Sequence, residues 1–395
     1  MNVRHIIQKS MLAMMAAVVL SGCNMMTEDL DDCPTGLYVN FVYDYNTQQA
    51  DMFKDHVGGL TLYVYDESDR LVTQRTVSGS ELNRYGYNIH FTEQELAPDH
   101  TYRLKVTAMQ KDWSAALQTP GAKYRKTDMS TGSDLKTFTI KLDRTEPETK
   151  APNNRAPYPY YEVSSVAPLD TMWYTLTTLK ANAENLPAAT KYHQNPDGSI
   201  TTNGIETITV VSGEPTYATV SLIRDTKHLN ISLREIDHPE DVYHEDYDVF
   251  ILDANGDLDY QNNLIIPTDS LIYRPYAEWT TTYDGEGTIG VQRSAHYDLM
   301  FNRLKYSPTP KDNAVLCIFK KKTNQVVAVL NLPQILSEGR TAYEIYSYQP
   351  QEYLDREYDY RLELFLKGEE WETLTELYVC IDVLSWAKRI QFEQL

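Results

Sequence analysis

The chain has 395 residues, enough for two domains of ordinary size, and its formal net charge is −20 at pH 7. A surface with this excess of carboxylates repels nucleic-acid phosphates and anionic lipid head groups, so the composition argues against DNA or RNA binding. Tyrosine, which occurs 30 times, favours strands and tolerates half-buried positions, and its abundance indicates a β-rich scaffold.

The first 22 residues have the layout of a bacterial lipoprotein signal peptide. Arg4 and Lys9 give it a basic start, and an apolar run follows at 11–20. That run would form a helix roughly 15 Å long, about half of a bilayer core, so it does not span a membrane. Cleavage after Gly22 would make Cys23 the new N-terminus and the site of lipid attachment. The alternative is an ordinary cleaved signal followed by a fortuitous cysteine.

An acidic tether is expected next, over residues 23–36. Without the two basic residues of the leader, the chain carries 34 Lys and Arg against 56 Asp and Glu, a formal charge of −22. The tether has no apolar periodicity, and its acidic side chains cluster soon after the cysteine, at Glu28, Asp29, Asp31 and Asp32.

A first β-domain is expected over residues 37–213. Its first strand, at 37–45, alternates with a period of two and is expected to turn one apolar face inward, made of Leu37, Val39, Phe41 and Tyr43. Other runs rich in strand-forming residues lie at 59–65, 70–75, 89–91, 102–108, 138–142 and 206–211. A weak helical pattern at 113–117 interrupts a polar stretch.

The second β-domain is expected over residues 214–395, with the boundary at the Ser-Gly-Glu-Pro sequence of 212–215. Its expected strands are 218–223, 228–233, 247–252, 314–319, 325–330, 360–366 and 377–383. The segment 341–357 is the best place for a helix or an ordered crossover. Short strands separated by turns predict an all-β protein with two β-sandwiches.

No pattern of residues indicates a catalytic site. The chain has no G-x-S-x-G elbow, no P-loop, no G-x-G-x-x-G and no C-x-x-C pair. Carboxylate pairs are too abundant in so acidic a chain to indicate a glycosidase. We expect no enzyme activity and no cofactor.

Two acidic segments have some features of metal sites. The segment 253–259 resembles a calcium loop, but its glycine is at the fourth position and no glutamate occupies the twelfth. Its Asn255-Gly256 pair favours a hairpin turn instead. The segment 237–246 has two histidines six residues apart among acids, a spacing that favours a solvated acidic loop. We therefore expect no metal site.

Three cysteines remain if Cys23 is lipidated: Cys33, Cys317 and Cys380. The last two lie in apolar strand-like runs and are expected to be buried. Two separate core thiols are favoured over a disulfide between them, and both alternatives stay open.

Several segments resemble one protein family in order along the chain. They are 33–46, 60–66, 253–256, 351–358 and the closing run 381–386. Together with the lipoprotein signal, they are similar to the fimbrillin-associated anchor proteins of Gram-negative gut and oral anaerobes. Members of that family hold fimbriae to the outer membrane.

The resemblance implies two transthyretin-like, Greek-key β-sandwich domains in tandem and no catalysis. It also implies fimbrial stalk subunits as partners. Subunits of the wider superfamily polymerise by strand addition, in which a segment of one chain completes the sheet of the next. Stalk subunits lose their first strand to a protease that cleaves after Arg or Lys.

No Lys or Arg occurs between Cys23 and Phe53, and Lys54 is the first. A trypsin-like enzyme therefore cannot detach the lipid without also removing the first strand. This favours a subunit that keeps both, as an anchor would, and that is a stable monomer when isolated. Cleavage at Lys54 would instead make the chain a fimbrial stalk or tip adhesin subunit.

The expected function is that of an outer-membrane lipoprotein that anchors a fimbrium at its base and limits its length. The acidic tether resembles surface-export signals of lipoproteins in these bacteria, which implies a surface-exposed position. The alternative from another class is a glycan-binding surface lipoprotein of a carbohydrate-uptake system, whose exposed tyrosines would stack on sugar rings.

Overall fold

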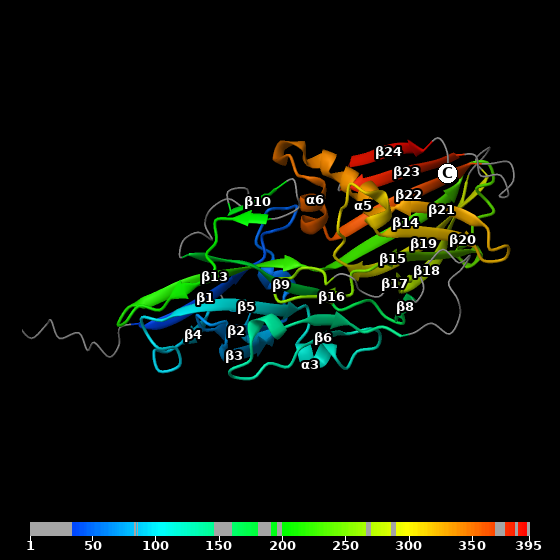
Figure 1. Cartoon of the computed structure of the whole chain (residues 1–395). Coiled ribbons are helices and arrows are strands. Elements are labelled where there is room, and N and C mark those ends of the chain that lie inside the picture. Colours follow the sequence, from blue (N-terminus) through cyan, green and yellow to red (C-terminus); the bar gives the residue numbers. More distant parts are fainter. Residues whose placement is uncertain are drawn as a thin grey trace, which may run out of the picture.

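The computed structural model describes residues 34–82, Arg84, 86–145, 160–180, 191–195, 200–265, 270–285, 290–367, 376–383 and 386–392 (Figure 1). The side chains of 376–392 lie outside this description. Most regular structure is strand, which confirms the all-β prediction. No helix in the described ranges is long and apolar enough to cross a membrane.

An eight-stranded sheet forms the N-terminal half, in the order β3-β2-β5-β9-β13-β1-β4, with β12 pairing to β5. Its strands are β1 (Gly36–Val42), β2 (Gly59–Tyr65), β3 (Leu71–Ser78), β4 (Ile89–Phe91), β5 (Thr101–Met109), β9 (Met172–Lys180), β12 (Ile208–Thr209) and β13 (Pro215–Arg224). A small hairpin of β10 (Tyr192–Gln194) and β11 (Ile200–Thr202) makes its own two-stranded sheet.

Both faces of this large sheet are buried at β2. All seven residues of β2 are buried, as expected for a short continuous apolar run. Leu62 and Val64 belong to the core that includes the side chains of β1, and Tyr63 belongs to the core on the other side. On that side lies a three-stranded sheet, in the order β16-β7-β6, of β6 (Tyr124–Lys126), β7 (Ile140–Leu142) and β16 (Asp257–Leu258). The ring of Phe138, beside β7, lies 5.4 Å from that of Tyr63.

The C-terminal half is a sandwich of two sheets. One has the order β18-β19-β14-β22-β23-β24 and the other β21-β20-β15-β17-β8. The strands are β8 (Tyr160–Val163), β14 (Thr226–Glu235), β15 (Tyr247–Asp253), β17 (Ser270–Tyr273), β18 (Ala277–Asp284), β19 (Val291–Asn302), β20 (Val315–Lys320), β21 (Val326–Asn331), β22 (Asp359–Lys367), β23 (Glu376–Val383) and β24 (Trp386–Phe392). Leu229, Ile231 and Leu233 alternate with polar residues along β14 and pack with Val249 and Ile251 of β15 in one core.

The helices are short. They are α2 (Phe53–His56), α3 (Trp113–Ala116), α5 (Leu332–Ser337) and α6 (Pro350–Arg356), with 3₁₀ turns η3 (Gly79–Glu81), η4 (Leu135–Thr137), η7 (His244–Asp246), η8 (Pro310–Asp312) and η9 (Glu338–Tyr346). The Asp112 carboxylate caps α3 by accepting from the N–H groups of Ser114 and Ala115. The helix expected within 341–357 is present as α6, and the end of η9 precedes it in the same segment.

The strands are divided between the two halves differently from the domain boundary expected near residue 213. β13, which follows that position, pairs with β1 and β9 in the first sheet, whereas the earlier β8 pairs with β17 in the sandwich. The Ser-Gly-Glu-Pro sequence at 212–215 forms a turn, in which the Glu214 N–H donates to the Val211 carbonyl (3.4 Å). Turn residues indicate a change of direction but not which sheet the next strand joins. The chain crosses between the halves through β8 and β16 and, most directly, at Asp225, the single residue between β13 and β14.

The backbone at Gly36 gives a first prediction. Gly36 has φ of +84°, and an added Cβ would lie 2.2 Å from the Phe91 carbonyl oxygen. Gly36→Ala should lower the free energy of unfolding by about 1–2 kcal/mol for the left-handed backbone and by a further ~1–3 kcal/mol for crowding. Gly132→Ala is the matched control, because Gly132 has φ of +87° and nothing within 4 Å of an added Cβ. Urea unfolding measures both variants, and equal losses of stability would contradict a tight approach at Phe91.

Candidate functional site

The first strand lies inside the sheet and not at its edge. β1 is parallel to β13 over all seven residues, Gly36–Val42, and antiparallel to β4 over 37–39. The four side chains expected on one face are at most 9% exposed and share one core: Leu37, Val39, Phe41 and Tyr43. Removing β1 would therefore uncover this core and leave one side of β13 unpaired.

Aromatic side chains hold the beginning of β1, next to the tether. The Tyr38 ring stacks on His90 of β4 (4.1 Å between centroids) and on Tyr217 of β13 (5.3 Å). The Nε2 atom of His90 also lies within hydrogen-bond distance of the Thr35 carbonyl oxygen (2.8 Å). Cross-strand pairs of this kind stabilise a sheet, and here they join three neighbouring strands where the tether meets the fold.

The segment that follows β1 forms a compact polar loop over residues 43–52. The Asn46 side-chain amide donates to the carbonyls of Tyr43 (3.0 Å) and Ala50 (2.8 Å). The buried Asp44 carboxylate pairs with Lys191 (2.5 Å) and accepts from the Tyr192 hydroxyl (2.6 Å). Burial raises the pKa of Tyr192, which keeps this hydroxyl protonated.

The same loop contacts the C-terminal half of the molecule. Thr47 donates to the Glu357 carboxylate (3.1 Å), and Gln49 donates to the Tyr348 hydroxyl (2.7 Å). The guanidinium of Arg356, a buried residue at the end of α6, lies 4.1 Å from the centre of the Tyr45 ring. A desolvated cation–π contact contributes about 2 kcal/mol. The first strand and its loop thus connect both halves.

Charged residues fill the junction beside this loop. Asp225 is fully buried and accepts from the Asn262 side chain (2.9 Å), with Arg303 Nε at 3.9 Å. Lys227 Nζ donates to the carbonyls of Asp355 and Glu357, both at 2.8 Å. Burial raises the pKa of Asp225 to about 6 and lowers that of Lys227 to about 7.

Sequence analysis missed this junction because Arg224-Asp225-Thr226-Lys227 was interpreted as a gap between two strands. The available signal was weak: among these four polar residues only Asp225 is a common turn former, and Gly, Pro and Asn do not occur. A polar interruption with so few turn residues between two apolar strands is compatible with a chain that continues straight from one sheet into another.

The residues expected at signal cleavage and lipidation, Gly22 and Cys23, lie outside the described residues, so both remain predictions. Lys54 is exposed in α2, just after the loop that follows β1. Cleavage after Lys54 would therefore remove β1 together with its contacts to the C-terminal half.

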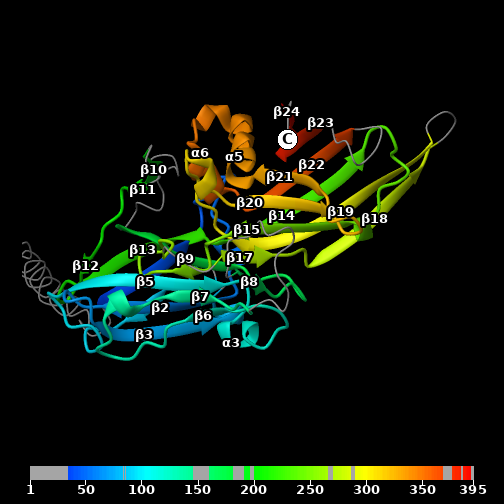
Figure 2. The same cartoon turned by 45° about the vertical axis from the view of Figure 1, so that its right-hand side comes forward.

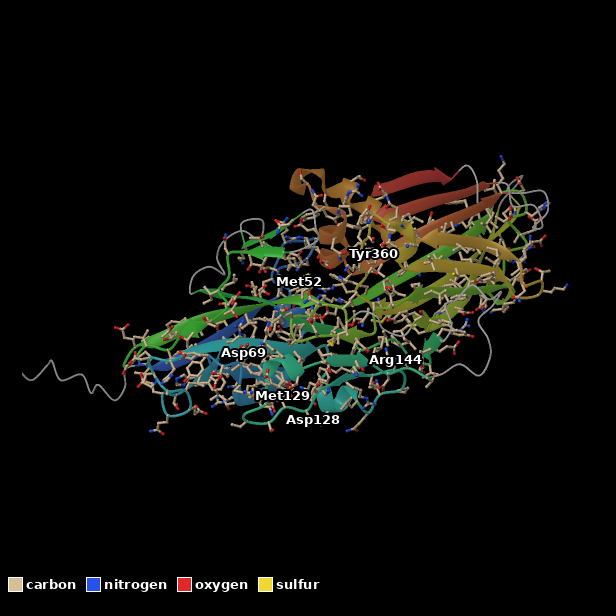
Figure 3. All side chains as sticks on the ribbon, viewed as in Figure 1. Met52, Asp69, Asp128, Met129, Arg144 and Tyr360 are labelled. Atoms are coloured by element: carbon tan, nitrogen blue, oxygen red, sulfur yellow. The ribbon has the colours of Figure 1, made fainter. Side chains whose placement is uncertain are left out.

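The segment expected as a hairpin at Asn255-Gly256 is a turn between two different sheets. It leads from β15 in the sandwich to β16, which pairs with β7. The Asn255 side chain donates to the Asn302 carbonyl (2.9 Å), and Asp257 pairs with Arg144 (2.9 Å), which is labelled in Figure 3. The hairpin prediction was wrong because its second strand joins another sheet. These contacts hold one end of the turn on the sandwich and the other on the small sheet of the first half.

The acidic loop at 237–246 contains the one group of three or more His, Cys, Asp or Glu side chains in the described chain whose ligand atoms all lie within 4.8 Å of one another. It consists of His238, Glu240 and Asp241, all exposed. Exposed acidic groups of this kind are common without a bound ion. His244 contacts the Thr280 hydroxyl instead (2.9 Å).

The two strand cysteines lie on different sheets. Cys317 is buried on β20 in a small cluster with Phe250 and Phe319. Cys380 is on β23, whose side chains lie outside the description. The choice between separate thiols and a disulfide therefore stays a prediction.

Asp253 gives a prediction about pH. Burial raises the pKa of this carboxyl to about 7, and one of its oxygens has no hydrogen-bond partner in the structure. The unfolded chain ionises Asp253 near pH 4, so between about pH 4 and 7 the folded state binds more protons and stability falls as pH rises. Asp253→Asn should flatten this fall, measured as urea midpoints at about pH 4.5, 6 and 8.

Glu245→Gln, which removes a carboxylate with 68% side-chain exposure, is the control for that pH profile. If the urea midpoint of Asp253→Asn fell with pH as steeply as that of wild type, Asp253 would not be buried and protonated. An equally flattened pH dependence in the Glu245→Gln control would contradict the prediction as well.

Comparison with known proteins gives one family and several related folds. A family model for the fimbrillin-A associated anchor proteins Mfa1 and Mfa2 matches residues 30–392. A candidate adhesin from Bacteroides thetaiotaomicron has a TM-score of 0.63 at 21% identity, with 92% of this chain and all of that chain covered. A candidate polysaccharide-binding protein from the same species has a TM-score of 0.62 at 22% identity and the same coverage.

The fimbrial anchor protein Mfa2 from Porphyromonas gingivalis is also similar, with a TM-score of 0.52 at 14% identity, over 90% of this chain and 99% of that one. No curated protein matches. At these identities the solved structures support the fold alone, and the family model supports the resemblance found in the sequence. Because that model matches nearly the whole chain beyond the expected signal peptide, the protein belongs to the family of fimbrillin-A associated anchor proteins.

Proposed function

We propose that this protein is an outer-membrane lipoprotein that anchors a fimbrium to the cell surface through lipid on Cys23. Its family associates it with fimbriae. The observation that carries the finer proposal is the first strand, which is buried inside the sheet and connected through its loop to α6. A chain that keeps this strand also keeps whatever is attached to its N-terminus.

The retained strand supports a place at the end of a fimbrium. Strand addition needs an open groove beside a sheet strand, and here β1 occupies the position between β13 and β4. A chain in this state has no groove for a foreign strand at that position. Such a subunit ends polymerisation, because no further subunit can add a strand at the β1 position. This is the property expected of an anchor that limits fimbrial length. We infer a binding role without catalysis.

A stalk or tip subunit would have to lose β1 by cleavage at Lys54, and the energetics disfavour this. Losing four core side chains removes roughly 6–12 kcal/mol of burial at about 1.5–3 kcal/mol each, comparable with the stability of a whole domain. The contacts of Thr47 and Gln49 across the junction would be lost as well. The intact chain needs no replacement strand and should be a stable monomer in solution.

Lipid attachment is tested at Cys23. Cys23→Ser should remove the protein from the membrane fraction, or leave it as unprocessed precursor, and fimbriae should appear in the medium, because multi-chain acylation is what makes membrane attachment stable. Fractionation and immunoblotting measure both. Cys33→Ser is the matched control and should behave as wild type. A processed, membrane-bound Cys23→Ser protein would contradict the proposal.

The first strand is tested by deleting residues 37–45. Because this strand supplies core side chains and a parallel partner of β13 along seven residues, the deletion should abolish cooperative thermal unfolding or make the protein aggregate or bind a foreign strand. Circular dichroism on heating and light scattering measure this. Deleting nine tether residues, 24–32, controls for chain length. Unchanged melting of the 37–45 deletion would show that the strand is not part of the core.

A further inference from the structure

Among the edge strands whose side chains the structure describes, β18 is the most exposed. Six of its eight residues are exposed, and among the described residues it pairs with β19 alone. Of the other edge strands, β3 has two exposed residues among eight, β21 is buried or half-buried throughout, and β8 and β4 have only four and three residues. A long strand with one unpaired side presents backbone N–H and C=O groups to any extended chain.

The sequence of β18 has few of the residues that usually protect such an edge. Edge strands are commonly blocked by charged side chains, above all Lys, by Pro or by a bulge, and of these β18 has only the carboxylates of Glu278 and Asp284. β18 instead reads Ala-Glu-Trp-Thr-Thr-Thr-Tyr-Asp, which is rich in residues that favour strands, and its register with β19 is regular over all eight residues. It therefore keeps the geometry needed to pair with another strand.

Aromatic side chains lie on both sides of this edge. Trp279 and Tyr283, at positions i and i+4 of β18, share one face and are 36% and 61% exposed. Trp279 stacks on His296 of β19 (5.1 Å), which fixes its ring. On the opposite face the acidic loop contacts β18 through His244 and Thr280, and its Tyr243 ring lies 4.7 Å from the Arg293 guanidinium. Exposed aromatic anchors of this type supply most of the binding energy at protein interfaces.

The surroundings of the edge are acidic. The loop at 237–246 carries five carboxylates, and β18 adds Glu278 and Asp284. Of the nearby cations, Lys321 already pairs with Glu278 (3.8 Å) and Arg293 contacts the loop. A complementary partner segment should therefore carry Lys or Arg.

The edge also lies far from the tether. Figures 1 and 2 show the β18–β19 hairpin at one end of the molecule and the start of β1 and β13 at the other. A protein held to a membrane at its N-terminus would therefore present β18 away from that membrane.

We propose that the free edge of β18 binds a fimbrial stalk subunit by accepting an extended, basic segment of that subunit as an additional strand. This inference rests on the proposed anchoring function and specifies the surface that carries it. Backbone hydrogen bonds along the edge would supply affinity, and contacts with the rings of Trp279, Tyr283 and Tyr243 would select the side chains of the added strand. An extended strand suits this edge better than a sugar does, because the edge offers a regular row of backbone N–H and C=O groups.

The surface is tested in cells that express the full chain, with a photo-activated cross-linking residue in place of Tyr283 or, as control, of Tyr217. Tyr217 is also an exposed strand tyrosine (43%), but it lies at the tether end. Mass spectrometry should find a fimbrial stalk subunit joined to position 283 through a segment containing Lys or Arg, and none at 217. Adducts at 283 with a glycan, with a second copy of this chain or with no partner would overturn the proposal.

Substitutions test the contribution of the aromatic rings. The double change Trp279→Thr and Tyr283→Thr keeps strand-forming residues and should release about tenfold more fimbriae into the medium, because two anchor side chains are lost. The protein itself should stay in the membrane fraction, unlike Cys23→Ser, which would release both. Val211→Thr, which changes an exposed side chain (42%) just before β13, should release no more than wild type. Retained fimbriae in the double variant, with wild-type protein levels, would overturn the β18 surface and leave lipid anchoring intact.

Charge is tested by comparing Tyr283→Lys with Tyr283→Glu. Both lose the same ring, but a lysine repels a basic segment and also blocks a sheet edge. Release of fimbriae should be severalfold greater for the lysine variant. Equal release, or more from the glutamate variant, would contradict a basic partner.

Discussion

Asp225 is the point on which the whole architecture depends. It is the single residue between β13 and β14, so one nearly continuous strand runs through the large sheet of the first half and into the sandwich of the second. A flexible linker would allow the halves to move independently. Here the passage is fully buried and is held by Asn262 and by the Asp225 N–H bond to the Met172 carbonyl (3.0 Å). The halves are therefore joined as one rigid unit.

An early strand and a late strand of the chain pack along the same path. β1 is the parallel partner of β13, and β22 is the parallel partner of β14. The loop after β1 meets the segment before β22, where Thr47 binds Glu357 and the His56 ring lies 5.9 Å from that of Tyr358. The N-terminal strand thus stabilises the first sheet and the junction together, and its loss would weaken both.

This arrangement suits a protein under tension. In the proposed anchor, a pull on the tether acts along the axis of β1, and its seven paired residues share the load with β13 because the strands are parallel. Separation then requires breaking all the pairs together, whereas a strand peeled from one end loses them one at a time. The stacked rings of Tyr38, His90 and Tyr217 and the close approach at Gly36 reinforce the end where the pull begins. The proposed partner edge lies at the far end, so force would pass through the rigid junction.

Buried charges at the junction have a cost as well as a role. Ionised groups lose hydration on burial, and a buried pair is often no more stable than apolar residues of similar size. Hydrogen bonds offset part of this cost. Asp225 accepts one from Asn262, and Lys227 donates to two backbone carbonyls. Our hypothesis is that they fix one orientation of the two halves, since a rotation would leave them buried without partners.

The sequence by itself determined the local features: the period-two alternation that makes β1 and β14 strands, the all-β class, the short helix α3 and the family resemblance. These depend on neighbouring residues, whose pattern fixes which side chains face a core. Only the tertiary structure decided which sheet each strand joins. β13 and β8 lie in the halves opposite to those expected, and Asn255-Gly256 joins two sheets instead of forming a hairpin. Strand pairing depends on contacts between residues far apart in the chain. The alternation of apolar and polar residues along a strand is the same whichever neighbouring strand it pairs with. For the same reason, the junction at Asp225 and the free edge of β18 became visible only in the folded molecule.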